Sequence, residues 1–477
     1  MFTFLLSLVL LILGYIFYGA FVEKIFKPDD SKTTPAYTMP DGVDYVPIST
    51  PKAFLIQLLN IAGLGPIFGA LSGALWGPVA FLWIVFGSIF AGAVHDYFSG
   101  MLSLRHKGGN VPDIVGIYLG STIKKIIIVF SVILLVLVGT VFMTGPAQLL
   151  SKLTPESLNF TFWLVIVLCY YLLATILPVD QIIGRLYPLF GAILIFMAIG
   201  VTGGILFKGY QIPELTLANL HPGKLPIWPL MFISIACGAI SGFHATQSPI
   251  MSRCVKKETD GRKVFYGAMI AEGIIALIWA AAGIAFYNGT PGLAEAIKAG
   301  GPGGVVHEIS TTLLGSIGGV LAVLGVIVCP ITSGDTAFRA ARMTIADTFN
   351  FEQKPISNRL YIAIPLFIIG AILSQINFDI IWRYFAWTNQ TLAMIVLWTA
   401  AVYLVKYRLL HWIATIPATF MSAVSVTYIL QAPEGFKLPI AISYPAGIIS
   451  ALILFGIFLR FIIKNNNAGI KSEQVSA

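Results

Sequence analysis

Long apolar runs constrain this chain more than any other feature of its sequence. Thirteen of them, each about 20 residues long, follow one another with more polar segments between them. A helix of this length crosses the hydrocarbon core of a bilayer. Charged residues make up only 10% of the sequence, whereas soluble proteins contain about 25%. The sequence therefore predicts an all-α polytopic membrane protein with about 13 transmembrane helices, embedded in a lipid bilayer.

The first run has no Lys or Arg before it and so lacks the positive region of a signal peptide. We therefore interpret it as an uncleaved first span. The predicted spans cover residues 2–20, 53–75, 78–103, 124–146, 160–178, 186–207, 227–250, 264–287, 312–336, 360–378, 382–404, 410–430 and 439–463.

The distribution of Lys and Arg predicts the orientation of these spans. Segments that follow odd-numbered spans hold 23 of the 29 basic residues, and the opposite side holds 6. Cytoplasmic loops carry the excess of Lys and Arg, so we expect the N-terminus outside and the C-terminus inside, in the plasma membrane. The net charge of +8 is then explained by cytoplasmic loops, and we expect no nucleic-acid partner.

The second span is interrupted in the middle of the membrane. Its segment "NIAGLGPIFGAL" runs from Asn60 to residue 71 and contains Gly63, Gly65, Pro66 and Gly69. Glycine costs a helix about 1 kcal/mol and an interior proline about 3 kcal/mol. Such a break is tolerated where the freed backbone lines a cavity inside protein. We therefore predict a broken helix beside a binding site.

The seventh span, "FISIACGAISGFHATQSPIM", is interrupted in the same way by Gly238, Gly242 and Pro249. Spans 2–6 and 7–11 each contain five helices, and because five is odd the second unit is inverted relative to the first. Two interrupted segments at matching positions of inverted repeats indicate a transporter binding site. The predicted division is residues 1–52, 53–208, 209–404 and 405–477: a first helix with a cytoplasmic loop, two repeats, and two C-terminal helices with a tail.

A broken helix presents N–H groups at one end and carbonyl groups at the other, which suit a carboxylate and a cation respectively. Small residues also allow close helix packing, and that alternative stays open, above all for Gly69 and Gly73. The predicted substrate-binding residues are Asn60, Gly63, Gly65, Pro66, Gly69, Gly238, Ser241, Gly242, His244 and Gln247.

Ionisable residues within spans are costly and indicate function. His95 and Asp96 in span 3 could relay protons or hold a cation, or could form a structural pair. Glu272 stands near mid-depth of span 8, where a desolvated carboxyl group favours its protonated form. It is a candidate proton carrier, or a partner in a helix–helix hydrogen bond. His244 could gate, bind a carboxylate or carry a proton, or could simply pack.

Other polar residues receive structural interpretations. Asn389 and Gln390 in span 11 are expected to hydrogen-bond between helices. The four cysteines have no metal-binding or disulfide spacing, and we interpret them as reduced packing residues. The sequence predicts no cofactor and no structural metal.

Several segments together resemble one known family, the carbon starvation protein A (CstA) family, over about residues 30–405. Members are bacterial inner-membrane transporters for peptides, and some take up pyruvate with protons. The resemblance implies a fold related to the leucine transporter (LeuT). This chain is similar to a short form of the family, and Ile56 and Gln57 stand where many members carry a His–His pair. The segments are "DGVDYVP" (41–47), "NIAGLGPIFG" (60–69), "FAGAVHDYFSGMLSLRHKG" (90–108), "TSGDTAFRAARMTIAD" (332–347) and "WTNQTLA" (387–393).

The segment after Cys329 offers hard oxygen ligands in Thr332, Ser333 and Asp335. The LeuT architecture implies a sodium site built from such a Ser/Thr pair and carbonyls of the first broken helix, here residues 62–65. The alternative is helix capping by these residues, with Arg339 paired to Asp335.

We therefore expect a secondary active importer of small carboxylate-bearing nutrients, peptides or pyruvate, active during carbon starvation. The predicted ion-coupling residues are His95, Asp96, Glu272, Thr332, Ser333 and Asp335, with H⁺ or Na⁺ as the coupling ion. A gradient-independent channel or transporter-like sensor is the alternative, and an intramembrane enzyme is a weaker one. The sequence does not choose an oligomeric state.

Overall fold

The computed structural model describes residues 1–42, 44–176 and 179–475, and this part of the chain contains helices and no strands. Eleven of its helical segments are long and apolar enough to cross a membrane, and a bent pair makes a twelfth. The predicted span 160–178 corresponds to the shorter apolar helix α10 (Phe160–Ile176), and residues 177 and 178 lie outside the described residues. The prediction of an all-α polytopic membrane protein is confirmed.

The first half of the chain supplies the elements that precede the second interrupted span. They are α1 (Phe2–Leu13), η1 (Gly14–Tyr18), α2 (Gly19–Phe26), α3 (Pro35–Thr38), α4 (Thr50–Ile61), η2 (Gly65–Gly69), α5 (Ala70–Gly73), η3 (Ala74–Trp76), α6 (Val79–Leu82), η4 (Trp83–Gly92), α7 (Ala93–Arg105), α8 (Val111–Leu119), α9 (Ser121–Leu153), α10, and α11 (Val179–Phe207).

The second half begins with the other interrupted span. Its elements are α12 (Leu230–Ile235), η5 (Ala236–Gly238), α13 (Gly242–Ser252), η6 (Glu258–Asp260), η7 (Arg262–Tyr266), α14 (Gly267–Phe286), α15 (Thr290–Val323), η8 (Leu324–Val328), α16 (Cys329–Phe349), α17 (Ile356–Leu373), α18 (Phe378–Lys406), α19 (Trp412–Gln431) and α20 (Ile440–Val475).

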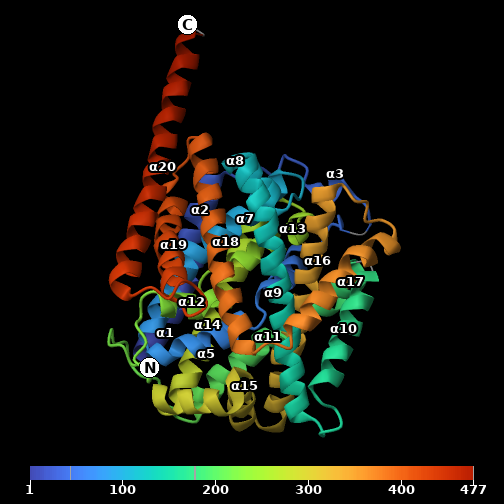
Figure 1. The fold of residues 1–477 in the computed structure, drawn as a ribbon, viewed down its shortest axis with the longest axis vertical. Coiled ribbons are helices and arrows are strands. Elements are labelled where there is room, and N and C mark those ends of the chain that lie inside the picture. Colours follow the sequence, from blue (N-terminus) through green and yellow to red (C-terminus); the bar gives the residue numbers. More distant parts are fainter. Residues whose placement is uncertain (43, 177–178, 476–477) are drawn as a thin grey trace.

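The two ends of the chain lie at opposite ends of the helical bundle, and α20 projects beyond it (Figure 1). The helices α10 and α15 lie toward one end, and α3 and α8 lie toward the other. An odd number of crossings places the termini on opposite sides of a membrane. The picture therefore agrees with thirteen spans, while the predicted direction of insertion stays a prediction.

The two interrupted spans meet in the core, where η2 packs against η5. The glycines make this approach possible. A Cβ atom on Gly65 would lie 2.2 Å from the Cβ atom of Cys237, and one on Gly242 would lie 2.4 Å from the backbone oxygen of Asn389. Neither position has room for a side chain. Gly65 is thus explained by contact between the two breaks, and Gly242 by the close approach of α18 (Phe378–Lys406).

Candidate functional site

The first break lies between α4 and the helical segment Gly65–Trp76, which bend by 58° relative to one another. Its freed carbonyl groups receive hydrogen bonds from α16. The Cys329 thiol donates to the Ala62 carbonyl at 2.8 Å, and the Ser333 hydroxyl donates to the Leu59 carbonyl at 2.9 Å. Side chains of a distant helix therefore hold the carbonyl end of the first break.

Two buried amides precede this break. Gln57 and Asn60 are fully buried, and none of their side-chain nitrogen or oxygen atoms has a hydrogen-bond partner among the described residues. Residues three apart share one face of a helix, and α4 packs against α13, α14 and α16. Because an unpaired buried amide costs about 1–3 kcal/mol, this amide pair marks a place suited to a polar ligand.

The second break covers residues 239–241 and is held differently. The prediction that Pro249 interrupts the span is wrong, because Pro249 lies within the helix α13. Asn389 accepts hydrogen bonds from the Ser241 hydroxyl at 3.0 Å and from the Phe243 N–H at 2.6 Å. The Gln390 amide donates to the Ile240 carbonyl at 2.9 Å. The structural interpretation of Asn389 and Gln390 agrees with these contacts, and their particular task is to bind unwound backbone.

Four ionisable side chains from three helices form one buried chain. His95 Nδ1 lies 2.7 Å from Asp96 Oδ1, and Asp96 Oδ2 lies 2.9 Å from His244 Nδ1. The other ring nitrogen of His244, Nε2, lies 3.2 Å from Glu272 Oε2. All four side chains are fully buried. The sequence selected each residue separately, and α7, α13 and α14 bring them together.

The last link of this chain differs from the others. The His244–Glu272 pair is close enough for an ion pair, but its atoms lack hydrogen-bond geometry, and both Glu272 oxygens have no hydrogen-bond partner among the described residues. Buried charges persist only when they are paired. Two carboxyl groups and two imidazoles can share protons in more than one arrangement. The buried chain of four side chains therefore suits proton uptake and release.

The predicted cation ligands Thr332 and Ser333 lie on α16 beside the first break. Both donate to the Cys329 carbonyl, at 2.7 Å and 3.1 Å respectively. They stand inside a helix that continues from η8, so their interpretation as N-terminal caps is wrong. Asp335 is buried on the same helix, and Arg339 donates to the Ala174 carbonyl at 2.7 Å.

The remaining predicted residues divide between packing and hydrogen bonding. A Cβ atom on Gly63 would lie 2.4 Å from the Phe142 ring, and one on Gly69 would lie 2.7 Å from the Ile235 carbonyl oxygen. Pro66 lies in η2, and Gly238 ends η5 close to it. Gln247 donates to the Thr246 hydroxyl at 3.0 Å, and its side-chain oxygen has no hydrogen-bond partner in the described structure.

The cysteines are free thiols, as expected, but they are not all simple packing residues. Cys329 is a hydrogen-bond donor to the first break. Asn389 donates to the Cys237 sulfur at 3.4 Å within the second break. In the loop after α13, burial raises the pKa of the Cys254 thiol to about 12, which leaves it protonated and unreactive.

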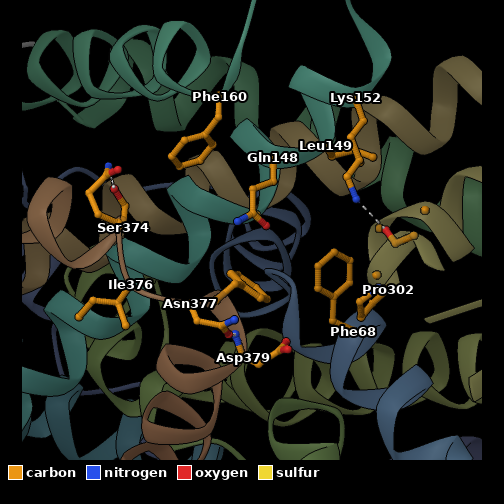
Figure 2. Close-up of a pocket in the computed structure, with 17 residues that line it drawn as sticks. Phe68, Gln148, Leu149, Lys152, Phe160, Pro302, Ser374, Ile376, Asn377 and Asp379 are labelled. Carbon is orange, nitrogen blue, oxygen red and sulfur yellow. Dashed lines mark hydrogen bonds between the residues drawn. The ribbon is translucent and has the colours of Figure 1, made fainter. Parts of the chain in front are cut away.

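A cavity of about 510 Å³ opens at the face that we predict to be outside (Figure 2). Phe68 of η2 lines it, together with Lys152 of α9, Asp379 of α18 and the glycine-rich turn 300–304. Lys152 donates to the Gly300 carbonyl at 3.3 Å. We call this cavity the vestibule. Sequence reasoning missed it, because its wall is assembled from four separate segments.

A series of aromatic contacts begins at Phe68 in the lining of the vestibule. Phe68 contacts Trp382 at a centroid distance of 6.2 Å, and Trp382 contacts Phe385 at 5.4 Å. Phe142 continues the series to Phe385 at 5.9 Å and to Phe243 at 5.8 Å, next to His244. These five rings, which we call the aromatic layer, connect the lining of the vestibule at Phe68 to Phe243, the neighbour of His244.

A polar cluster surrounds Arg105 at the opposite face, where Arg105, Glu258 and Tyr403 line a cavity of about 470 Å³. The Arg105 guanidinium pairs with Glu258 at 3.0 Å, donates to the Tyr403 hydroxyl at 2.6 Å and donates to the Lys27 carbonyl at 2.9 Å. The Arg105 cluster joins the ends of α2, α7 and α18 to the loop after α13.

Comparison with solved structures identifies the class of fold. The structure of MhsT in complex with L-phenylalanine matches with a TM-score of 0.54 at 16% identity, over 87% of this chain and 98% of that one. The closed conformation of Mhp1, a nucleobase-cation-symport-1 family transporter, gives a TM-score of 0.53 at 15% identity, over 87% of this chain and 92% of that one. Both have the LeuT fold, and the predicted architecture is confirmed.

Comparison of sequences identifies the family. The model described as "Carbon starvation protein CstA" matches residues 1–158 and 147–290. An uncharacterized membrane protein of Haemophilus influenzae is 46% identical, over 63% of this chain and 95% of that protein. The chain belongs to the carbon starvation protein CstA family, as its sequence segments indicated.

Two further relatives carry functional names. The peptide transporter CstA of Campylobacter jejuni is 24% identical, over 91% of this chain and 81% of that protein. The pyruvate/proton symporter BtsT of Escherichia coli is 26% identical, over 56% of this chain and 46% of that protein.

Proposed function

We propose that this protein is a secondary active transporter that imports small carboxylate-bearing nutrients, peptides or pyruvate, together with protons. The single observation that carries the proposal is the buried chain of His95, Asp96, His244 and Glu272. It lies next to the second break, and imidazole and carboxyl groups exchange protons near neutral pH when their environment changes. The names of the relatives support a transporter rather than an enzyme.

Charge balance explains why such a chain suits symport. A carboxylate that enters the buried centre adds a negative charge beside Asp96 and Glu272, at high cost in a medium of low dielectric constant. A proton taken up by one of the side chains of the buried chain cancels that charge. Substrate and proton therefore favour each other's binding, and this coupling is reciprocal. A proton gradient then drives accumulation of the substrate.

The first break supplies the groups that hold the substrate. The unpaired amides of Gln57 and Asn60 can donate to carboxylate or carbonyl oxygens. The helical segment that starts at Gly65 turns its N-terminal end toward the break, and this end of a helix favours negative charge. Lys152 in the vestibule attracts anions before they pass the aromatic layer.

The experiment that tests this function is uptake into proteoliposomes. Labelled pyruvate is supplied under a pH gradient and, separately, under a sodium gradient, with dipeptides as competitors. Saturable accumulation under the pH gradient, blocked by unlabelled pyruvate and not by dipeptides, identifies a monocarboxylate–proton symporter. Block by dipeptides, or uptake of a labelled dipeptide alone, identifies a peptide transporter. Flux without saturation or gradient dependence identifies a channel and overturns the proposal.

A variant of Glu272 tests the coupling. Glu272→Gln removes the proton site at the end of the buried chain of side chains and keeps the side-chain volume. We expect loss of gradient-driven uptake, while exchange of labelled for unlabelled substrate continues. Glu156→Gln, which removes an exposed carboxylate, is the matched control and should behave as the parent. Driven uptake by Glu272→Gln at the parent rate would exclude this role.

Sodium coupling is a second hypothesis, which the position of Thr332 and Ser333 supports. Their hydroxyl oxygens lie near the carbonyls of Leu59 and Cys329, and such oxygens suit a hard cation. Replacing both residues by Ala should then raise the sodium concentration needed for half-maximal uptake. Parent transport that is indifferent to sodium removes this hypothesis and leaves the proton hypothesis intact.

We further propose that the protein works in the plasma membrane with its N-terminus outside, and that uptake matters during carbon starvation. The family description supports the second point. Cysteines introduced at exposed positions of the two predicted faces, probed with a membrane-impermeant maleimide in intact cells, test the orientation. Growth of a deletion strain on pyruvate or peptides as limiting carbon tests the physiological role.

A further inference from the structure

A second large cavity, of about 800 Å³, opens between α1, η1, α4 and α14, outside the transport site described above. Its wall is formed mainly by apolar side chains, with Lys263 at one end. We call this cavity the lateral groove. The side chains used in the argument below are Ile12, Phe54, Leu55, Ala271 and Ile274.

The lateral groove has the length of one lipid leaflet. Lys263 lies in η7, and Ile274 lies 11 positions later on the continuous helix formed by η7 and α14. At 1.5 Å per residue this separation is about 16 Å. The hydrocarbon core of a bilayer is about 30 Å thick, so the groove extends from the membrane surface to about mid-depth. An acyl chain has this shape and this chemistry.

Charge is confined to one end of the groove. The Lys263 side chain is exposed and makes no ion pair among the described residues. The neighbouring Arg262 is paired with Glu23 at 3.0 Å and lies over the Tyr15 ring at 5.5 Å, which leaves the Lys263 ammonium available. Lys52, half-buried on α4, adds a second cation near the same end. This end belongs to the face that we predict to be cytoplasmic.

We propose that the lateral groove binds an anionic phospholipid, with its phosphate on Lys263 and one acyl chain between α4 and α14. The Lys263 ammonium at the membrane surface complements the charge of the headgroup. Each buried CH₂ group of the acyl chain adds favourable transfer free energy. The lipid packs on the two helices that carry the amide pair and Glu272. Its binding therefore stabilises the arrangement of these helices and does not depend on the transported substrate.

Thermal unfolding of the delipidated full-length protein in detergent tests this site. Phosphatidylglycerol, added in mixed micelles, should raise the unfolding midpoint by about 3 °C, and phosphatidylcholine with the same chains should not. Lys263→Gln should weaken the phosphatidylglycerol effect about fivefold in half-saturating concentration. Lys256→Gln removes another exposed lysine of the same predicted cytoplasmic loop and should leave the effect unchanged.

A second pair of measurements tests the acyl chain. Ala271→Trp fills the groove and should abolish retention of phosphatidylglycerol in native mass spectrometry, whereas glycerol phosphate alone should stabilise no form of the protein. If Ala271→Trp fails to fold, the smaller Ala271→Leu replaces it. Equal stabilisation by phosphatidylglycerol and phosphatidylcholine, or equal losses in Lys263→Gln and Lys256→Gln, would overturn the proposal, and neither result bears on substrate transport.

Discussion

The two interrupted spans look alike in the sequence, but the structure holds them in different ways. At the second break, side-chain amides of α18 bind the unwound backbone. At the first break, a thiol and a hydroxyl of α16 bind the carbonyl groups, while the amides of Gln57 and Asn60 have no hydrogen-bond partner in the described structure. The backbone of the second break is therefore held by hydrogen bonds next to His244 of the buried chain. The first break retains unpaired amide groups that can bind a ligand.

From this difference we expect separate tasks for the two breaks. Substitutions at the second break should damage the fold, whereas substitutions of the amide pair at the first break should damage transport alone. The four predictions below test this separation, from the largest expected effect to the smallest.

Gly242→Ala should have the largest effect. The added Cβ atom would lie 2.4 Å from the Asn389 backbone oxygen and 2.6 Å from the Ala393 nitrogen, and backbone atoms cannot move aside cheaply. Overpacking of this kind costs about 1–3 kcal/mol or more, so we expect poor assembly and at least tenfold loss of uptake. Size-exclusion chromatography and thermal unfolding measure the outcome. Gly456→Ala, which meets no atom within 4 Å, is the control and should be neutral.

Asn389→Ala should destabilise the protein by about 1–3 kcal/mol, because it leaves the buried Phe243 N–H without its acceptor. Thermal unfolding in detergent measures the loss. Asn60→Ala is the matched comparison, since it removes the same side chain from an equally buried position at the other break. If both variants lose stability equally, the two breaks do not differ as we infer.

Asn60→Ala should leave the unfolding midpoint unchanged and weaken substrate binding roughly tenfold. One lost hydrogen bond is worth about 0.5–1.5 kcal/mol, and 1.4 kcal/mol corresponds to a factor of ten in affinity. Initial rates of uptake over a range of substrate concentrations separate an effect on KM from one on the maximal rate. Parent-like affinity in this variant would place the substrate elsewhere.

Cys329 should show the smallest effect. Cys329→Ala removes the donor to the Ala62 carbonyl and should cost about 0.5–1.5 kcal/mol. Cys329→Ser restores a donor of similar size and should be close to neutral. Chemical denaturation of the two variants side by side measures the difference. A serine variant as unstable as the alanine variant would show that the thiol acts through packing.

The spans and their interruptions could be predicted from the sequence because they depend on local composition. Apolar runs of membrane length and clusters of Gly and Pro are visible without any neighbour. His95, Asp96, His244 and Glu272 could also be selected as candidates from the sequence, since each is an ionisable group within an apolar run.

The contacts that join these four residues could not be predicted from the sequence. Asp96 and His244 are 148 positions apart in the sequence, and their contact depends on how α7 packs on α13. The unpaired state of the Gln57 amide depends in the same way on which side chains α11, α13, α14 and α16 place around α4. Hydrophobic periodicity does not specify the angles at which helices cross or the side chains that meet between them. The vestibule and the difference between the two breaks therefore become visible only when the helices are packed.

The aromatic layer has a consequence for the energy supply of a cell. The exchangeable protons of the buried chain lie within the membrane, where they could let protons leak across and dissipate a proton gradient. Of the rings in the aromatic layer, those of Phe68, Phe385 and Phe142 carry no exchangeable proton and only Trp382 has an N–H group, while the Arg105 guanidinium pairs with Glu258 toward the opposite face. If the buried chain carries the coupling proton, as we propose, the gradient is conserved only when this chain exchanges protons together with the nutrient and never with both aqueous phases at once.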